Sequence, residues 1–153
     1  MRKEFHLLNL GIGGDKTQNV LWRLDHGEMD GYRTRFVSLM IGTNNADDTP
    51  EDRAEGIRAV LAKIAEKQPD ATILLSPIFP NGATPDAPER ISRAKTNAII
   101  RGYADGKRIV WLDFNSEFLD ANGNLSPEMM PDYLHPLEAG YRIWAAALKR
   151  AIR

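Results

Sequence analysis

Hydrophobic residues along this chain alternate between short continuous runs and longer stretches with the spacing of an α-helix. A short apolar run bounded by glycine, proline or turn residues predicts a buried strand, whereas apolar residues at i, i+3, i+4 and i+7 predict a helix. The predicted strands span residues 5–10, 36–41, 71–76 and 108–112. The predicted helices span residues 17–24, 50–68, 89–103 and 138–152. This alternation favours an α/β fold with a mainly parallel sheet between layers of helices.

Capping residues and apolar spacing add detail to the predicted helices. Thr49 is expected to cap the second helix, with Pro50 at its first position. Asp15, followed three residues later by Gln18, fits a capping box that would start the first helix. The residues expected to face inward from the third helix are Ile91, Ala94, Ala98 and Ile99. The tryptophans expected at core-like positions are Trp22, Trp111 and Trp144.

Length and composition are those of a single domain over residues 1–153, because 42% of the residues are hydrophobic. The formal net charge of −1 gives no field that would attract nucleic acid or an anionic membrane. The sequence has no cysteine and only three histidines, so we expect chemistry without a metal or cofactor. No apolar run approaches the roughly 20 residues of a membrane-spanning helix. As written the chain is expected to be cytoplasmic, but an export signal would lie ahead of residue 1 in a longer protein, so the compartment stays open.

Polar and glycine-rich segments follow two of the predicted strands. Gly11–Asp15 comes directly after the first strand, Gly42–Asn45 follows the second, and Asp132–Pro136 lies just before the last helix. Parallel sheets bind ligands outside the carboxyl ends of their strands. We therefore expect these segments to meet at one edge of the sheet.

Asp132 and His135 are the candidate base and its orienting acid. A histidine that acts as a general base needs an acceptor on its second ring nitrogen, which fixes the tautomer and stabilises the imidazolium. Gly13 and Gly14 let the backbone approach a ligand closely, and the N–H groups at the start of the helix that follows can point at an anion. Asn44 can offer its side-chain NH2 to a developing negative charge. The alternatives remain that Asp132 only caps a turn, that His135 is a surface residue, and that both loops are plain turns. The glycine loop lacks the Lys-Ser/Thr of a P-loop, so a nucleotide site is poorly supported.

Three stretches, in order, resemble sequence blocks of the SGNH (GDSL-type) hydrolases. They are Asn9–Asp15, Gly42–Asn45 and Asp132–His135, which are similar to the second, third and fifth blocks of that family. The run Gly13–Leu24 and the Gly-Thr-Asn-Asn loop resemble the branch of the platelet-activating-factor acetylhydrolase catalytic subunits and bacterial carbohydrate acetylesterases. The resemblance covers nearly the whole chain.

This resemblance implies a flavodoxin-like three-layer αβα sandwich that hydrolyses esters through a serine acyl-enzyme. It implies that His135 is the general base, Asp132 its orienter, and the Gly14 N–H and Asn44 side chain two oxyanion donors. The implied substrate carries a small acyl group, acetyl above all, on a carbohydrate or lipid. No cofactor is implied.

The chain departs from the family in its first block, a strand followed by Gly-Asp-Ser that carries the nucleophile. No Gly-Asp-Ser occurs in the sequence, and only 13 residues precede Gly14. The fold is therefore expected to lack the family's first β-α unit, whose central strand would lie between the strands at 5–10 and 36–41. The explanations left open are an incomplete sequence, a non-catalytic module that binds acylated ligands or a protein partner, and a homodimer or other assembly in which a strand is completed in trans.

Overall fold

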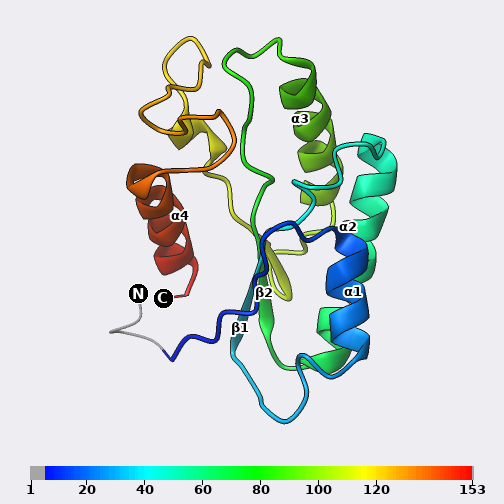
Figure 1. Cartoon of the computed structure of the whole chain (residues 1–153). Helices are drawn as coiled ribbons and strands as arrows, with labels where there is room; N and C mark the ends of the chain where they lie inside the picture. Colours follow the sequence, from blue (N-terminus) through cyan, green and yellow to red (C-terminus); the bar gives the residue numbers. More distant parts are fainter. Residues whose placement is uncertain (1–5, 153) are drawn as a thin grey trace.

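A parallel sheet with helices on both faces forms the centre of the computed structural model, which describes residues 6–152. In the order in which they pair, its three strands are β1 (Phe36–Leu39), β2 (Thr72–Leu75) and β3 (Ile109–Trp111). The helices are α1 (Thr17–Asp25), α2 (Pro50–Lys67), α3 (Pro88–Arg101) and α4 (Glu138–Ala151), with a short 3-10 helix, η1 (Asn115–Phe118). Helices α1, α2 and α3 cover one face of the sheet and α4 covers the other (Figure 1). The predicted α/β fold is confirmed.

Each strand contributes to two hydrophobic cores because successive side chains point to opposite faces of a sheet. Ile73 and Leu75 of β2 are buried in the core below α1 and α2, whereas Leu74 between them is buried in the core below α4. All three strands are shorter than the apolar runs that predicted them. The residues that follow β1 and β2 leave the sheet and form loops.

Helix α2 follows its sequence pattern closely. The Thr49 hydroxyl accepts a hydrogen bond from the Asp52 N–H at 3.1 Å, and Pro50 is the first helical residue, as predicted. The helix approaches α1 closely at Gly56, where a Cβ atom would lie 2.6 Å from the hydroxyl oxygen of Thr17. Its buried apolar residues are Ala54, Ile57, Val60, Leu61 and Ile64.

The strand predicted at residues 5–10 is wrong in its described part. His6–Leu10 forms no strand, and the side chains of Leu7 and Leu8 are exposed, while Phe5 lies outside the described residues. An apolar run becomes a strand only when another strand satisfies its backbone hydrogen bonds. Within residues 6–152, β1 is one of the two edge strands of the sheet and has no strand paired on its outer side.

The capping box predicted for α1 is also wrong. The helix begins at Thr17, and the Asp15 carboxylate instead accepts a hydrogen bond from Arg23 at 2.5 Å. Arg23 also pairs with Glu28 at 2.7 Å, so one guanidinium joins the segment before α1 to the segment after it. Trp22, expected in the core, is 62% exposed and stacks on the ring of His26.

The face of helix α3 that is buried differs from the face that its apolar spacing predicted. Ile91, Ala94 and Ala98 are exposed. The residues that are buried instead are Arg90, Arg93, Thr96 and Ile100. The helix packs partly against loops, whose backbone carbonyls accept hydrogen bonds from arginine, and this reverses the usual preference of arginine for solvent. In the part of the chain that the structure describes, no helix is long and apolar enough to cross a membrane.

Candidate active site

A tight turn before α4 holds Asp132 and His135 against each other. One carboxylate oxygen of Asp132 accepts hydrogen bonds from the backbone N–H groups of Leu134 (3.1 Å) and His135 (2.8 Å). The other accepts from Nδ1 of His135 at 2.7 Å. Tyr133 between them has φ 54°, the one positive φ of a non-glycine residue within 6–152, and such a conformation costs about 1–2 kcal/mol. Two hydrogen bonds offset that cost in part. The Tyr133 N–H donates to the Met130 carbonyl at 2.9 Å, and the Tyr133 carbonyl accepts from the Gly82 N–H at 3.1 Å.

The electrostatics of this pair suit a base and its orienting acid. The hydrogen bond from the His135 ring, followed by that from the His135 backbone N–H, lowers the pKa of Asp132 to about 2. Because Asp132 is ionised, Nδ1 of His135 must carry the hydrogen, which leaves Nε2 as the basic nitrogen. No described residue hydrogen-bonds Nε2, and the side chain is 77% exposed, so a hydroxyl group can reach it.

Gly14 and Asn44 lie on two loops that the structure brings together. The Asn44 side-chain NH2 donates a hydrogen bond to the carbonyl of Asp15 at 3.0 Å. Gly14 has φ +85°, a Cβ atom at this position would meet nothing within 4 Å, and its N–H has no acceptor among residues 6–152. The turn is therefore open beside a free backbone donor, as an oxyanion site requires.

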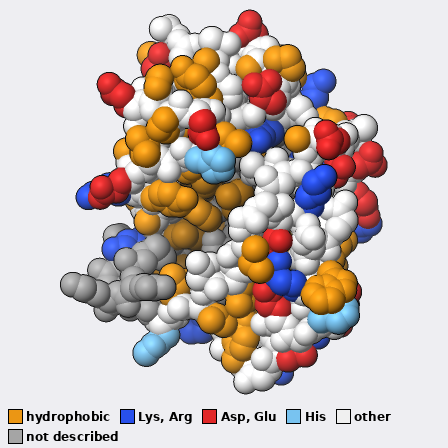
Figure 2. Space-filling model, in the orientation of Figure 1, with side chains coloured by type: hydrophobic (Ala, Val, Ile, Leu, Met, Phe, Trp, Pro, Cys, Tyr) orange, Lys and Arg blue, Asp and Glu red, His pale blue; other side chains and the backbone are white. Residues whose placement is uncertain are grey.

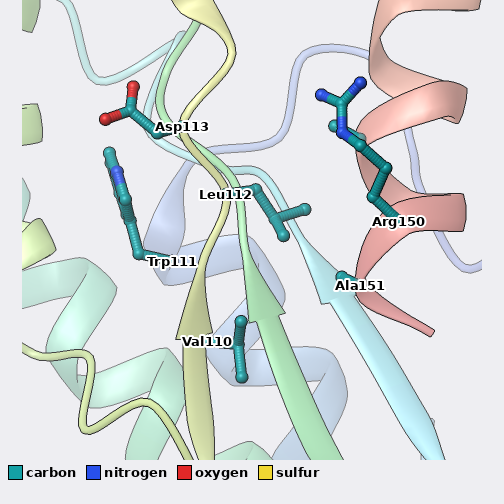
Figure 3. Close-up of a pocket in the computed structure, with 7 residues that line it drawn as sticks. Val110, Trp111, Leu112, Asp113, Arg150 and Ala151 are labelled. Carbon is teal, nitrogen blue, oxygen red and sulfur yellow. The ribbon is translucent and has the colours of Figure 1, made fainter. Parts of the chain in front are cut away.

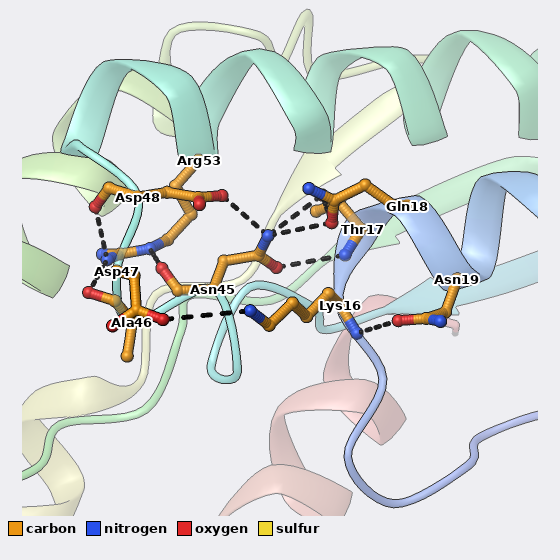
Figure 4. Close-up of polar contacts among 9 residues, drawn as sticks. All are labelled: Lys16, Thr17, Gln18, Asn19, Asn45, Ala46, Asp47, Asp48 and Arg53. Carbon is orange, nitrogen blue, oxygen red and sulfur yellow. Dashed lines mark hydrogen bonds and ion pairs between the residues drawn. The ribbon is translucent and has the colours of Figure 1, made fainter.

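Asn45, which the sequence analysis did not single out, fastens these two loops to each other (Figure 4). Its side chain is fully buried, and its oxygen accepts a hydrogen bond from the Thr17 N–H at 3.0 Å. Its NH2 donates to Thr17 Oγ1, Gln18 Oε1 and Asp48 Oδ2 at 3.3, 3.1 and 2.8 Å. Arg53 donates to the Asn45 carbonyl at 2.9 Å. The signal in the sequence was the second Asn of Gly-Thr-Asn-Asn, which that analysis treated as part of a turn.

The predicted site residues thus form two groups. Within the described chain, no hydrogen bond joins the Asp132–His135 pair to Gly14 or Asn44. The segment that follows β2 contacts the first group, because the Gly82 N–H in this segment donates to the Tyr133 carbonyl. Asn97 fixes the same segment through two hydrogen bonds of 2.8 Å to the backbone of Ile78.

A pocket beside β3 and a serine at the end of β2 lie apart from these two groups. A shallow pocket lies where the end of β3 faces α4, between Leu112, Arg150 and Ala151 (Figure 3), and none of the predicted site residues lines it. Ser76, at the end of β2, is 2% exposed, and its hydroxyl accepts a hydrogen bond from Trp144 at 3.0 Å. Residues 6–152 contain no cluster of three or more His, Asp or Glu side chains that could hold a metal ion. The geometry therefore points to the turn at Asp132 and the paired loops.

Residues 2–143 match the model of the GDSL-like lipase/acylhydrolase family. The platelet-activating factor acetylhydrolase IB subunit alpha1 of Bos taurus is 39% identical to this chain over 137 residues, which are 89% of this chain and 59% of the relative. The chain therefore spans 59% of the length of the curated relative it matches.

Two solved structures share the fold. An acetylxylan esterase from Geobacillus stearothermophilus superposes with a TM-score of 0.77 at 19% identity, over 95% of this chain and 71% of that one. A GDSL-like lipase from Bacteroides thetaiotaomicron gives a TM-score of 0.77 at 21% identity, over 93% of this chain and 73% of that one. At these identities the likeness concerns the fold alone.

Proposed function

This chain belongs to the GDSL-like lipase/acylhydrolase family, and on that premise we propose that it provides the catalytic base and oxyanion donors of a serine ester hydrolase. The substrate class is a small acyl ester, acetyl first, of a carbohydrate or lipid. The observation that carries the proposal is the 2.7 Å hydrogen bond between His135 and an ionised Asp132, with the other ring nitrogen open to solvent.

Each group has a defined part in the proposed reaction. Nε2 of His135 accepts the proton of the attacking serine hydroxyl and returns it to the leaving alcohol, while Asp132 holds the ring and stabilises the imidazolium. The Gly14 N–H and the Asn44 NH2 donate to the oxyanion of the tetrahedral intermediate. Asn44 uses one amide hydrogen on Asp15 and keeps the second for the substrate. A donor of this kind contributes about 3 kcal/mol to the transition state.

We propose that the nucleophilic serine comes from a Gly-Asp-Ser segment outside these 153 residues that pairs with the outer edge of β1. The sequence itself contains no Gly-Asp-Ser, and Ser38 lies inside β1 rather than at its carboxyl end. Figure 2 shows hydrophobic side chains in a hollow over the gap between α4 and β1. Half-buried apolar residues of the core below α4 include Phe36 and Met40 near this edge, and Ile143 and Trp144 on α4. An unpaired strand edge beside apolar side chains is suited to an added strand, supplied by the same polypeptide or in trans.

The test is hydrolysis of p-nitrophenyl acetate by this chain and by a version extended to include Gly-Asp-Ser. We expect little activity from residues 1–153 alone and activity from the extended protein that falls by at least about a thousandfold in His135→Ala. His26→Ala is the matched control, because His26 stacks on Trp22 on the exposed side of α1. An extended protein with the serine but without His135-dependent activity would refute the proposal.

Acidification gives a second test of the same roles. Protonated imidazole cannot accept the serine proton, so the hydrolysis rate of the extended protein should fall on acidification. A rate that does not fall on acidification contradicts a histidine base.

The lack of Gly-Asp-Ser in the sequence favours a second candidate function, a module that keeps the pocket and binds acylated ligands or a protein partner without hydrolysis. This candidate predicts saturable binding of an acetylated sugar or lipid ester with no turnover. A genomic reading frame that continues upstream of Met1 into Gly-Asp-Ser would count decisively against it.

A further inference from the structure

Three arginines are buried on the face that α2 and α3 turn toward the site loops. Arg53, Arg90 and Arg93 are 2%, 8% and 8% exposed. None of them forms an ion pair with a carboxylate within residues 6–152. A buried cation without a counter-charge is costly unless backbone or side-chain oxygens satisfy its donors. Each of the three therefore needs an explanation from its hydrogen bonds.

Two of these arginines are accounted for as structural links. Arg90 donates to the carbonyls of Gly82, Asn81 and Gly123 at 2.6, 2.7 and 3.1 Å, which joins two loops. Arg53 donates to the Asn45 carbonyl at 2.9 Å and to the Asp48 carbonyl at 3.1 Å. Their removal would leave buried or half-buried carbonyls without donors.

Arg93 is different, because its donors are poorly satisfied. Its guanidinium makes only two hydrogen bonds to described residues, to the carbonyls of Phe79 and Thr43, both at 3.4 Å and so at the outer limit for a hydrogen bond. The pKa of Arg93 is lowered to about 10, mainly by burial and then by the nearby charge of Arg53, while Glu89 acts in the opposite direction. The side chain thus remains charged at neutral pH with little to compensate it.

The position of Arg93 relates this charge to the proposed active site. Thr43 directly precedes Asn44, the candidate oxyanion donor. Phe79 belongs to the segment after β2 that reaches the catalytic turn through Gly82. The guanidinium therefore contacts both loops that leave the carboxyl ends of β1 and β2, where parallel sheets place their ligands.

We propose that Arg93 binds a small carboxylate at this edge of the sheet. The planar guanidinium presents paired N–H groups that match the two oxygens of a carboxylate. Because the side chain is only 8% exposed, we expect a small anion such as acetate to reach it most readily. The identification of this anion as the acid released by ester hydrolysis rests on the proposed function, whereas the anion site itself does not.

The first test compares the stability of Arg93→Met with that of Arg90→Met, measured by urea unfolding. Replacing a poorly compensated buried charge with an apolar side chain of similar length is often neutral or stabilising. We expect Arg93→Met to unfold at the same or a higher urea concentration than the wild type, and Arg90→Met at a lower one. If Arg93→Met is destabilised as much as Arg90→Met, Arg93 is a structural link and the proposal is overturned.

The second test is a titration with sodium acetate, followed by the backbone amide NMR signals of Thr43 and Asn44. We expect saturable shifts in the wild type and binding weaker by about ten- to a hundredfold in Arg93→Met. Arg93→Lys, which keeps the charge without the fork, should bind acetate with intermediate affinity. Unchanged binding in Arg93→Met, shifts confined to other residues, or no saturable binding would overturn the site.

Two further ligands test the size and chemistry of the anion. Butyrate should bind more weakly than acetate if the site is as enclosed as the exposure of Arg93 indicates. Inorganic phosphate that binds more tightly than acetate would overturn the assignment to a carboxylate. None of these measurements requires ester hydrolysis. The proposed anion site is therefore tested independently of the proposed esterase activity.

Discussion

Asn45→Ala is expected to destabilise the protein far more than a substitution in an exposed loop normally does. The mutation removes the only acceptor of the buried Thr17 N–H in the described structure and the donor to Asp48. An orphaned buried N–H costs about 1–3 kcal/mol, and the lost hydrogen bond to the Asp48 carboxylate adds about 1.5–3 kcal/mol more. We therefore expect the free energy of unfolding to fall by about 3–5 kcal/mol, a large part of the roughly 5–15 kcal/mol typical of a domain.

Urea unfolding followed by circular dichroism measures this loss, and Asn44→Ala is the matched control. Asn44 is exposed and makes one hydrogen bond, to the Asp15 carbonyl, so its removal should cost less than about 1 kcal/mol. Amide hydrogen exchange gives a local measure, because the Thr17 N–H should lose protection beyond the global change in Asn45→Ala. If Asn45→Ala and Asn44→Ala are equally stable, the reasoning about the buried amide is refuted.

Other consequences of the structure can be measured directly. The pKa of Asp132 is lowered from 3.8 to about 2, so its hydrogen bonds stabilise the turn above about pH 4, and this contribution is lost as the pH falls through about 2. An NMR titration of the Asp132 carboxylate should show a midpoint near 2, whereas a midpoint near 3.8 would contradict the pairing with His135. Gly56→Ala would place a Cβ atom 2.6 Å from Thr17 Oγ1 and should lower the free energy of unfolding by about 1–3 kcal/mol. Thermal unfolding measures this loss, and an unchanged midpoint temperature would show that α1 can move away from α2. Thr49→Ala should cost about 1 kcal/mol and Thr49→Ser much less, and equal losses would mean that the cap does not contribute.

The elements that could be predicted from the sequence are those whose determining residues lie close together in one segment of the chain. Helix α2 was predictable because its apolar stripe and its Thr49 cap lie in one segment. The contact between Asp132 and His135 was predictable for a similar reason, because three residues separate them. Such features need no knowledge of the rest of the fold.

The features that were missed depend on partners far away in the sequence. His6–Leu10 has the composition of a strand, but the described chain offers it no neighbouring strand. Helix α3 buries Arg90 and Arg93 because its inner face meets loop carbonyls, and hydrophobicity assigns arginine to solvent. The role of Asn45 depends on Thr17, 28 residues earlier, and no spacing rule connects them.

The hydrogen bonds that shape the Asp132–His135 turn have a consequence for reading relatives of this chain. Within residues 6–152, the carboxylate of Asp132 accepts hydrogen bonds only from residues in the next three positions, so the pair itself is formed by four consecutive residues. If the proposed function holds, a relative that has lost activity can therefore still retain this turn. The loops of Gly14 and Asn44 are joined by contacts between distant segments, such as that of Thr17 with Asn45, and mutation can loosen these contacts without changing the histidine. On the proposed function, divergence at those contacts is an earlier sign of lost catalysis than loss of the histidine itself.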